Sequence, residues 1–163
     1  MQGGRKKEVL ITTIKKDIWQ IHQKIMKSAI VIPTNGSVNV GNHAVMGKGL
    51  AADVRKRFPS FARELGYYLL DGPNVVQYFP EYHIITFPTK HEWYQPADMN
   101  LIRQSCRQLV ELIENNNLQQ VYLPRVGCGN GKLRWEQVRP LLEEEFDDVK
   151  DRIIFVEHNH ATK

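Results

Sequence analysis

Cysteine is scarce in this sequence, and long apolar runs are absent from it. Only two cysteines, Cys106 and Cys128, occur among the 163 residues, which is too few for a disulfide framework. Neither stands in a Cys-x-x-Cys or Cys/His spacing, so we expect no structural zinc, and nothing else in the sequence requires a metal or a cofactor. No stretch is long and apolar enough to cross a membrane, and the N-terminus lacks the apolar segment of a secretory signal. These absences favour a cytoplasmic protein that does not contact membranes.

Two common phosphate-binding signatures are also missing. The stretch Gly47-Lys48-Gly49 is followed by a leucine and two alanines, so the dinucleotide fingerprint Gly-x-Gly-x-x-Gly is not completed. The P-loop pattern fails as well, because its glycine, lysine and hydroxyl residue do not follow Gly41 at the required spacing. Standing alone, this glycine pair indicates either an anion site or a tight turn into a helix.

The composition that remains is that of an ordinary globular protein. Hydrophobic residues make up 42% of the chain and charged residues 25%, enough to build one core. We expect a single domain over residues 1–163, with its core in about residues 8–158 and short flexible ends, acting as a monomer. The net charge of +4 predicts mild attraction to anions, but it does not by itself predict nucleic-acid binding.

Apolar runs alternate with helical patterns along the chain. In the helical stretch 96–117, Met99, Ile102, Cys106, Leu109 and Ile113 fall on one face. Further helices are expected over 134–146 and after the glycine pair, within 44–59. The strands are expected at 8–14, 29–34, 75–80, 83–89, 121–127 and 152–158, the third and fourth pairing through a short connection. This order predicts a three-layer α/β domain with a largely parallel or mixed sheet.

Three loops follow expected strands and carry chemically useful residues. They are "NGSVNVGNHAVMGKG" after residue 34, "TKHEW" after 88, and "VGCGNGKLRW" after 125. Ligands of open α/β sheets bind beyond the carboxyl ends of the strands, so the three loops should converge on one rim. Two of them are rich in glycine and lead into helices, whose N–H groups and positive ends suit a diphosphate.

Five motifs in order, "KKDI", "IPTNG", "AVMGKGLA", "FPTKHEW" and "LPRVGCGNGKLRW", resemble the macro domain, an ADP-ribose-binding module. The similarity extends from about Glu8 to Glu157 and is strongest to the branch of the DarG antitoxins and terminal ADP-ribose glycohydrolases. The resemblance implies a three-layer α/β/α fold with a mixed, mostly parallel six-stranded sheet, and ADP-ribose lying across its top. It implies ADP-ribose or an ADP-ribosylated macromolecule as partner, with ADP-ribosylated DNA among the candidates.

Each motif residue has a role implied by the resemblance and a plainer alternative. Asp17 would accept from the adenine amino group beside the Ile18 backbone; alone, it would be expected to be a helix N-cap. Asn35 would meet the hydroxyls of the distal ribose, and it equally suits an Asn-Gly turn. Gly47, Gly49 and Ala51 would let the backbone approach the diphosphate, with Lys48 pointing outward. The implied ligand-binding set is Asp17, Ile18, Asn35, Gly47, Lys48, Gly49, Leu50, Ala51, Thr89, Val126, Gly127, Cys128, Gly129, Asn130 and Gly131.

Lys90, in the "PTK" loop, is the catalytic residue that the resemblance implies, acting at the anomeric carbon of the distal ribose. An ordinary lysine pKa of about 10.4 makes deprotonation cost roughly 4 to 5 kcal/mol near neutral pH. Desolvation would lower that pKa and a diphosphate would raise it, so Lys90 is either a nucleophile or base, or a fixed cation. A Cys128 nucleophile with His91 as its base is disfavoured, because the family tolerates cysteine in this loop. Trp135 is expected in the core rather than stacked on the adenine. The run Arg55–Arg57 is expected on a solvated helix face, although with a nucleic-acid substrate it would be the first candidate for phosphate contacts.

One position departs from the pattern of the protein glycohydrolases. They carry an aspartate in the second glycine loop, where this chain has Gly131. The antitoxin macro domains are glycine-rich there, which favours ADP-ribose on a DNA base over ADP-ribose on protein. We therefore expect an ADP-ribosyl hydrolase. The alternatives are a module that binds ADP-ribose or an NAD-derived nucleotide without turnover, and an ADP-ribose 1″-phosphate phosphatase.

Overall fold

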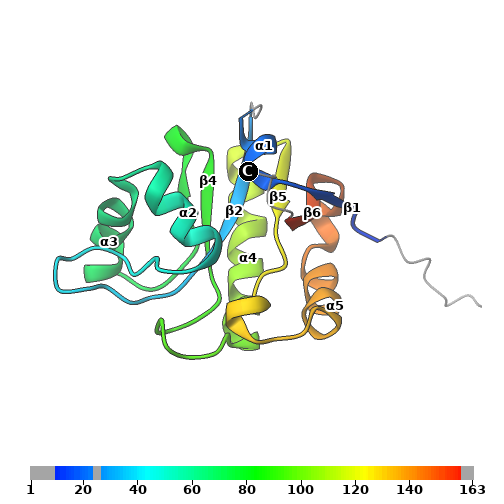
Figure 1. The fold of residues 1–163 in the computed structure, drawn as a ribbon. Coiled ribbons are helices and arrows are strands. Elements are labelled where there is room, and N and C mark those ends of the chain that lie inside the picture. The colour runs from blue at the N-terminus through cyan, green and yellow to red at the C-terminus, as the bar shows by residue number, and fades with distance from the viewer. Residues whose placement is uncertain (1–9, 24–26, 159–163) are drawn as a thin grey trace, which may run out of the picture.

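A computed structural model describes residues 10–23 and 27–158 of the chain. Six strands form one sheet in the order β1-β6-β5-β2-β4-β3, and only β3 runs antiparallel to its neighbour. Figure 1 shows β2 between β4 and β5 in the middle of this sheet. The strands are β1 Thr13–Lys16, β2 Ser28–Thr34, β3 Gln77–Phe79, β4 Ile84–Pro88, β5 Gln120–Leu123 and β6 Ile153–His158. The mixed, mostly parallel six-stranded sheet is therefore confirmed.

Helices cover both faces of the sheet. They are α1 Ile18–His22, α2 Gly49–Arg57, α3 Phe61–Asp71, α4 Met99–Asn116 and α5 Trp135–Glu145, with short 3-10 turns at Pro80–Tyr82, Gly129–Gly131 and Asp147–Arg152. Alternate residues of β2 face opposite ways: Ala29 and Val31 pack with α4 and α5, while Ile30 and Ile32 pack with α1, α2 and α3. Both faces of β2 are thus buried, which explains its continuous apolar sequence.

Local residues explain most element boundaries. Helix α4 begins after Asp98, whose carboxylate accepts from the N–H of Asn100, and it ends at Asn117, which has a left-handed φ of 50°. It therefore starts three residues later than expected. Strand β5 stops at Leu123, short of the expected residue 127, because Pro124 follows and has no N–H to donate.

Two elements differ more from the sequence prediction. The first strand begins at Thr13, not at residue 8; residues 8 and 9 lie outside the described ranges, and residues 10–12 are not in a strand. Its side chains are mostly exposed, so no apolar pattern marks its ends. Helix α3 was not predicted, although Phe61 and Leu65 recur at helical spacing and are buried. In the described part of the chain, no helix has the length and apolar character needed to cross a bilayer.

Candidate active site

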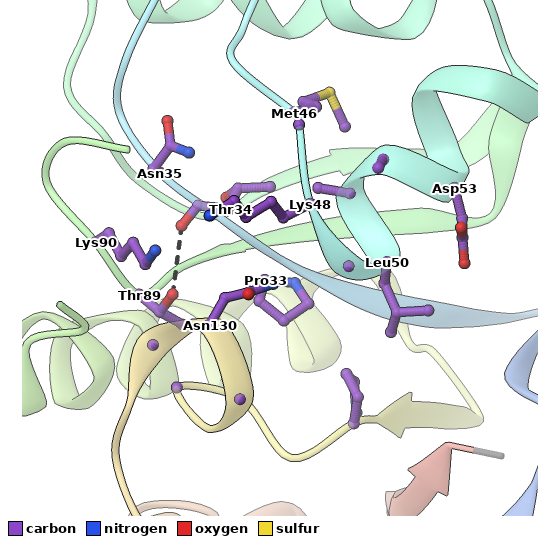
Figure 2. Close-up of a pocket in the computed structure, with 18 of the residues that line it drawn as sticks. Pro33, Thr34, Asn35, Met46, Lys48, Leu50, Asp53, Thr89, Lys90 and Asn130 are labelled. Carbon is purple, nitrogen blue, oxygen red and sulfur yellow. Dashed lines mark hydrogen bonds between the residues drawn. The ribbon is translucent and has the colours of Figure 1, made fainter. Parts of the chain in front are cut away.

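A cleft of about 1070 Å³ lies beyond the carboxyl ends of β2, β4 and β5. The loops that follow these three strands all contribute to its lining, so the predicted convergence on one rim is confirmed. Figure 2 shows Asn35 and Lys90 at one end of the cleft and Asp53, on α2, at the other. This volume is large enough for a ligand of the size of a dinucleotide.

The first glycine-rich loop brings bare backbone to the cleft. A Cβ added to Gly47 would meet no heavy atom within 4 Å, and Gly49 begins α2 with a φ of +61°. No side chain caps the N-terminus of α2, so its first N–H groups are left for another acceptor. Residues Gly47 to Asp53 line the cleft, which puts the positive end of this helix beside it. Lys48 also lines the cleft, although the sequence favoured an outward direction.

The second glycine-rich loop lies opposite the first. Gly127 and Gly129 have positive φ values of +79° and +68°, and Gly129–Gly131 form a 3-10 turn. The two loops meet where the side-chain nitrogen of Asn130 lies 3.3 Å from the position of a Cβ on Gly49. A bound diphosphate would therefore have backbone N–H groups on two sides.

Lys90 lies in the loop that follows β4. The Thr89 N–H donates to the Thr34 carbonyl at 2.9 Å, which holds the loop against the end of β2. The ammonium of Lys90 donates to the carbonyl of Trp93 at 3.3 Å. Partial burial, and then the charges of Lys48 and Lys132, lower the pKa of Lys90 from its ordinary value. The neutral form of the Lys90 amine is therefore more favoured in the protein than it would be in water.

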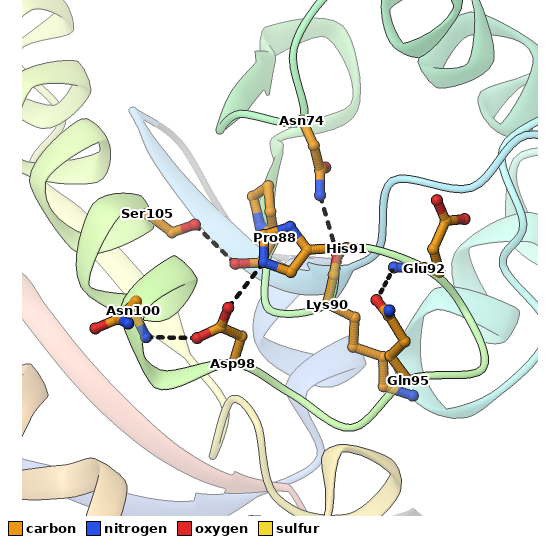
Figure 3. A network of polar contacts seen from close by, with 9 residues as sticks. All are labelled: Asn74, Pro88, Lys90, His91, Glu92, Gln95, Asp98, Asn100 and Ser105. Carbon is orange, nitrogen blue, oxygen red and sulfur yellow. Dashed lines mark hydrogen bonds and ion pairs between the residues drawn. The ribbon is translucent and has the colours of Figure 1, made fainter.

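A polar network fixes the backbone around Lys90 (Figure 3). Asn74 donates to the Lys90 carbonyl at 3.0 Å, and Ser105, on α4, donates to the Pro88 carbonyl at 2.7 Å. His91 and Asp98 are joined by a 2.8 Å contact between imidazole Nε2 and a carboxylate oxygen. Lys90 is consequently presented by a braced loop rather than by a loose one.

Asn35 makes the turn that the Asn-Gly sequence predicts. Its side-chain oxygen accepts from the Ser37 N–H at 2.9 Å, and its amide nitrogen donates to the Val45 carbonyl at 3.1 Å. An amide has a second donor hydrogen and a second lone pair, so a place in this turn leaves Asn35 able to meet a ligand in the cleft that it lines.

Three residues of the predicted binding set are not part of the cleft lining: Asp17, Ile18 and Val126. Asp17 caps α1 through a 2.9 Å bond from the Trp19 N–H, as the plainer alternative expected. The Ile18 N–H donates to Nδ1 of His158 at 3.2 Å, and Val126 is fully buried. His158 itself lines the cleft, so Asp17 and Ile18 lie immediately behind a lining residue.

The residues of the disfavoured cysteine mechanism are poorly suited to it. Burial raises the pKa of the Cys128 thiol, which opposes formation of the thiolate nucleophile. His91 is engaged by Asp98 and is not a lining residue. Trp135, as expected, packs against the core, with its ring 5.3 Å from that of Phe155.

Some lining residues were not assigned from the sequence. Trp93 lines the cleft from the "TKHEW" loop, where its place in the motif was the available signal. The run Arg55–Arg57 is exposed, as the sequence predicted, and Lys56 also lines the cleft. Its neighbours have intramolecular contacts: Arg55 donates to the Met46 carbonyl, and Arg57 lies 4.2 Å from the ring centre of Trp19. Among the described residues, no group of three or more His, Cys, Asp and Glu side chains could hold a metal ion.

Comparison with known proteins shows the family of this chain. A model of the macro domain matches residues 76–142. The ADP-ribose glycohydrolase OARD1 of Bos taurus is 30% identical over 113 residues, which cover 66% of this chain and 71% of that protein. The chain belongs to the macro domain family.

Relatives of this macro domain include bacterial proteins. The DNA ADP-ribosyl glycohydrolase of Mycobacterium tuberculosis is 32% identical over 138 residues, which cover 72% of this chain and 36% of that protein. The chain therefore spans about a third of that relative's length. Among solved structures, the macrodomain of Mycobacterium tuberculosis DarG has a TM-score of 0.63 at 29% identity, covering 81% of this chain and 89% of that one. The macrodomain of Thermus aquaticus DarG has a TM-score of 0.73 at 22% identity, covering 93% and 99%.

Proposed function

We propose that this macro domain binds ADP-ribose in the cleft and hydrolyses the bond that joins a single ADP-ribose to a macromolecule. The observation that carries the proposal is Lys90, a lysine of lowered pKa held on a braced loop at one end of a glycine-lined cleft. The chain acts, on this proposal, as a single monomeric domain.

The binding part of the proposal uses the two glycine-rich loops. The diphosphate takes the free N–H groups at the start of α2 and those of the turn Gly129–Gly131. Asn35 and Lys90 share one end of the cleft, so the distal ribose lies there. The adenine then takes the opposite end, towards His158, with Asp17 and Ile18 behind it.

The catalytic part of the proposal uses the neutral amine of Lys90. As a nucleophile, Nζ forms a bond to the anomeric carbon while the bond to the attached atom breaks and its electron pair leaves with that atom; water then hydrolyses the adduct, which frees ADP-ribose and the amine. As a base, Nζ takes a proton from the water that attacks the same carbon while the bond to the attached atom breaks and its electron pair leaves with that atom. Both roles need a deprotonated amine, which the lowered pKa favours, whereas a fixed cation gains nothing from it.

DNA is the favoured carrier of the ADP-ribose. Gly131 supplies no carboxylate where the resembled protein glycohydrolases have an aspartate. The bacterial relatives are named for hydrolysis of ADP-ribosyl DNA. Together these points support a substrate in which a nucleobase is the leaving group.

Two variants of Lys90 test this function against thymidine-linked ADP-ribosyl DNA and a pool of ADP-ribosylated proteins. Lys90→Ala should abolish release of ADP-ribose while much of the affinity for free ADP-ribose remains. Lys90→Arg keeps a cation that does not deprotonate, so it should be as inactive as Lys90→Ala. An active Lys90→Arg would sink the nucleophile and base roles and leave the fixed cation.

A binding module without turnover is the second candidate. It is favoured by the bond from the Lys90 ammonium to the Trp93 carbonyl, which turns the amine towards its own loop. On that alternative, wild type and Lys90→Ala both bind ADP-ribose and neither releases it from DNA or protein. Release of phosphate from ADP-ribose 1″-phosphate by such a protein would instead identify the phosphatase.

A further inference from the structure

Two neighbouring aromatic residues of the Lys90 loop are exposed, and one of them lines the cleft. Trp93 is 53% exposed and lines the cleft, and Tyr94 is 67% exposed. Their ring centres are 5.6 Å apart and their planes are nearly perpendicular at 87°. More than half of each residue is therefore exposed to a partner, and burial in the core does not explain either of them.

The backbone under these rings is fixed. The Trp93 N–H donates to Ser37 at 2.9 Å, and the Ser37 hydroxyl donates to the Glu92 carboxylate at 2.7 Å. The Trp93 carbonyl accepts from the Lys90 ammonium. The same residue thus touches the proposed catalytic amine through its backbone and offers a ring to whatever is attached to the ADP-ribose.

Two further positive charges lie near Lys90, which is in the loop that carries the rings. Lys48 and Lys132 are close enough to Lys90 to lower its pKa, and neither has an ion-pair partner within the described part of the chain. The two acidic residues of the lining already have partners within the chain. Glu157 pairs with Arg125, and Asp53 accepts from the Trp19 indole at 3.1 Å. Cations beside open aromatic faces suit a single nucleic-acid strand, whose phosphates and bases need those two groups.

We propose that Trp93 and Tyr94 form a stacking surface for the nucleobases of a single-stranded nucleic acid, the base that carries the ADP-ribose and its neighbour. The proposal rests on the proposed function for the ADP-ribose itself and adds how the macromolecule is held. Lys48 and Lys132 contact the phosphates of that strand. A folded protein substrate has no flat base to place on Trp93 and gains less from this surface.

The test compares Trp93→Ala, Trp93→Phe and Tyr67→Ala with wild type. Tyr67, on α3, is 72% exposed but lies outside the cleft lining, so it controls for loss of any exposed aromatic ring. The probe is a short fluorescein-labelled oligothymidine strand without ADP-ribose, bound at low salt and followed by anisotropy. Trp93→Ala should weaken its binding by about 5- to 150-fold, Trp93→Phe should keep most of it, and Tyr67→Ala should change nothing.

A second measurement separates this inference from the proposed function. Affinity for free ADP-ribose should be equal in wild type and Tyr94→Ala, because Tyr94 belongs to the stacking surface but is not a residue of the cleft lining, whereas oligothymidine binding by Tyr94→Ala should fall. Equal oligothymidine binding by wild type and Trp93→Ala would overturn the stacking surface, whether or not ADP-ribose is hydrolysed. If Trp93→Ala lost as much affinity for an ADP-ribosylated peptide as for oligothymidine, that result would also overturn the stacking surface. Wild type that neither binds nor releases ADP-ribose would defeat the proposed function, and the oligothymidine result would still decide this inference.

Discussion

The two glycine-rich loops of the cleft use the same residue for different physical reasons. In the first loop, a Cβ on Gly47 would meet nothing within 4 Å, so the protein itself has no need for a glycine there. In the second loop, a Cβ on Gly127 would lie 2.8 Å from Cδ1 of Ile102, and one on Gly131 would lie 2.9 Å from Cβ of Ala97. The first loop leaves room for a ligand, whereas the second loop is glycine-rich largely because the core presses against it.

This difference indicates that Gly131 has a structural role. The departure from the aspartate pattern is coupled to the neighbour at position 97, since Ala97 fills the space that a side chain at 131 would need. The Ala97 N–H also donates to the Gly131 carbonyl at 3.0 Å, so the two segments cannot separate without losing a bond. Position 131 therefore serves packing in this chain.

Gly131→Asp should be the most disruptive change in either loop. It forces a Cβ against a rigid methyl group and buries a carboxylate, and we expect the free energy of unfolding to fall by about 2–4 kcal/mol. Urea denaturation measures this fall. Gly131→Ala separates the steric part from the charge. Adding Ala97→Gly should recover part of the loss, and no recovery would contradict the proposed coupling to Ala97.

Gly127→Ala should cost somewhat less. Its φ of +79° strains any L-residue, and the contact with Ile102 adds crowding that this flexible side chain can partly relieve. A loss of about 1–3 kcal/mol in the free energy of unfolding is expected. Gly129→Ala is the matched control, because its φ of +68° brings the strain while nothing lies within 4 Å of its Cβ. Equal losses in both variants would show that crowding contributes nothing.

The sequence predicted the sheet well, because the central strands are buried on both faces and read as continuous apolar runs. Strand β1 was misplaced because it is an edge strand with mostly exposed side chains, which carry no apolar pattern. The convergence of three loops could be predicted because parallel strands end at the same edge. Helix α3 had a recognisable spacing at Phe61 and Leu65 that the prediction passed over.

The detailed geometry of the site could not be predicted from the sequence, for a different reason. Which glycine faces the ligand and which faces the core depends on Ile102 and Ala97, residues distant in sequence from the first loop and packed by the tertiary fold. The lowered pKa of Lys90 likewise depends first on its partial burial and then on the charges of Lys48 and Lys132, which come from two other loops. Local sequence motifs do not encode such tertiary contacts.

Gly47→Ala should weaken ADP-ribose binding without lowering stability, which would sharpen the contrast between the two glycine-rich loops. Because its Cβ would occupy open space, the free energy of unfolding should change by less than about 0.5 kcal/mol. The added methyl group would instead enter the space of the diphosphate, and we expect affinity for ADP-ribose to fall about tenfold, which is about 1.4 kcal/mol. Calorimetric titration with ADP-ribose, beside thermal denaturation, measures both quantities. A destabilised Gly47→Ala that binds normally would reverse the assignment of the two loops.

The Lys90 loop differs from both glycine-rich loops, because polar contacts rather than packing hold it. Asp98→Asn, in this loop, should have the smallest effect on the free energy of unfolding. The hydrogen bond from His91 holds the pKa of Asp98 below its usual range. A depressed carboxyl pKa stabilises the folded state above the pKa of the unfolded chain, and this stabilisation is lost as pH falls through the folded-state value. The Asp98→Asn variant keeps a helix-capping oxygen but not the charge, so the loss should be about 0.5–1 kcal/mol at about pH 7. The difference between the unfolding free energies of wild type and variant should shrink as pH falls through the folded-state pKa of Asp98, and a difference that did not shrink would mean that the cap, not the charge, had been damaged.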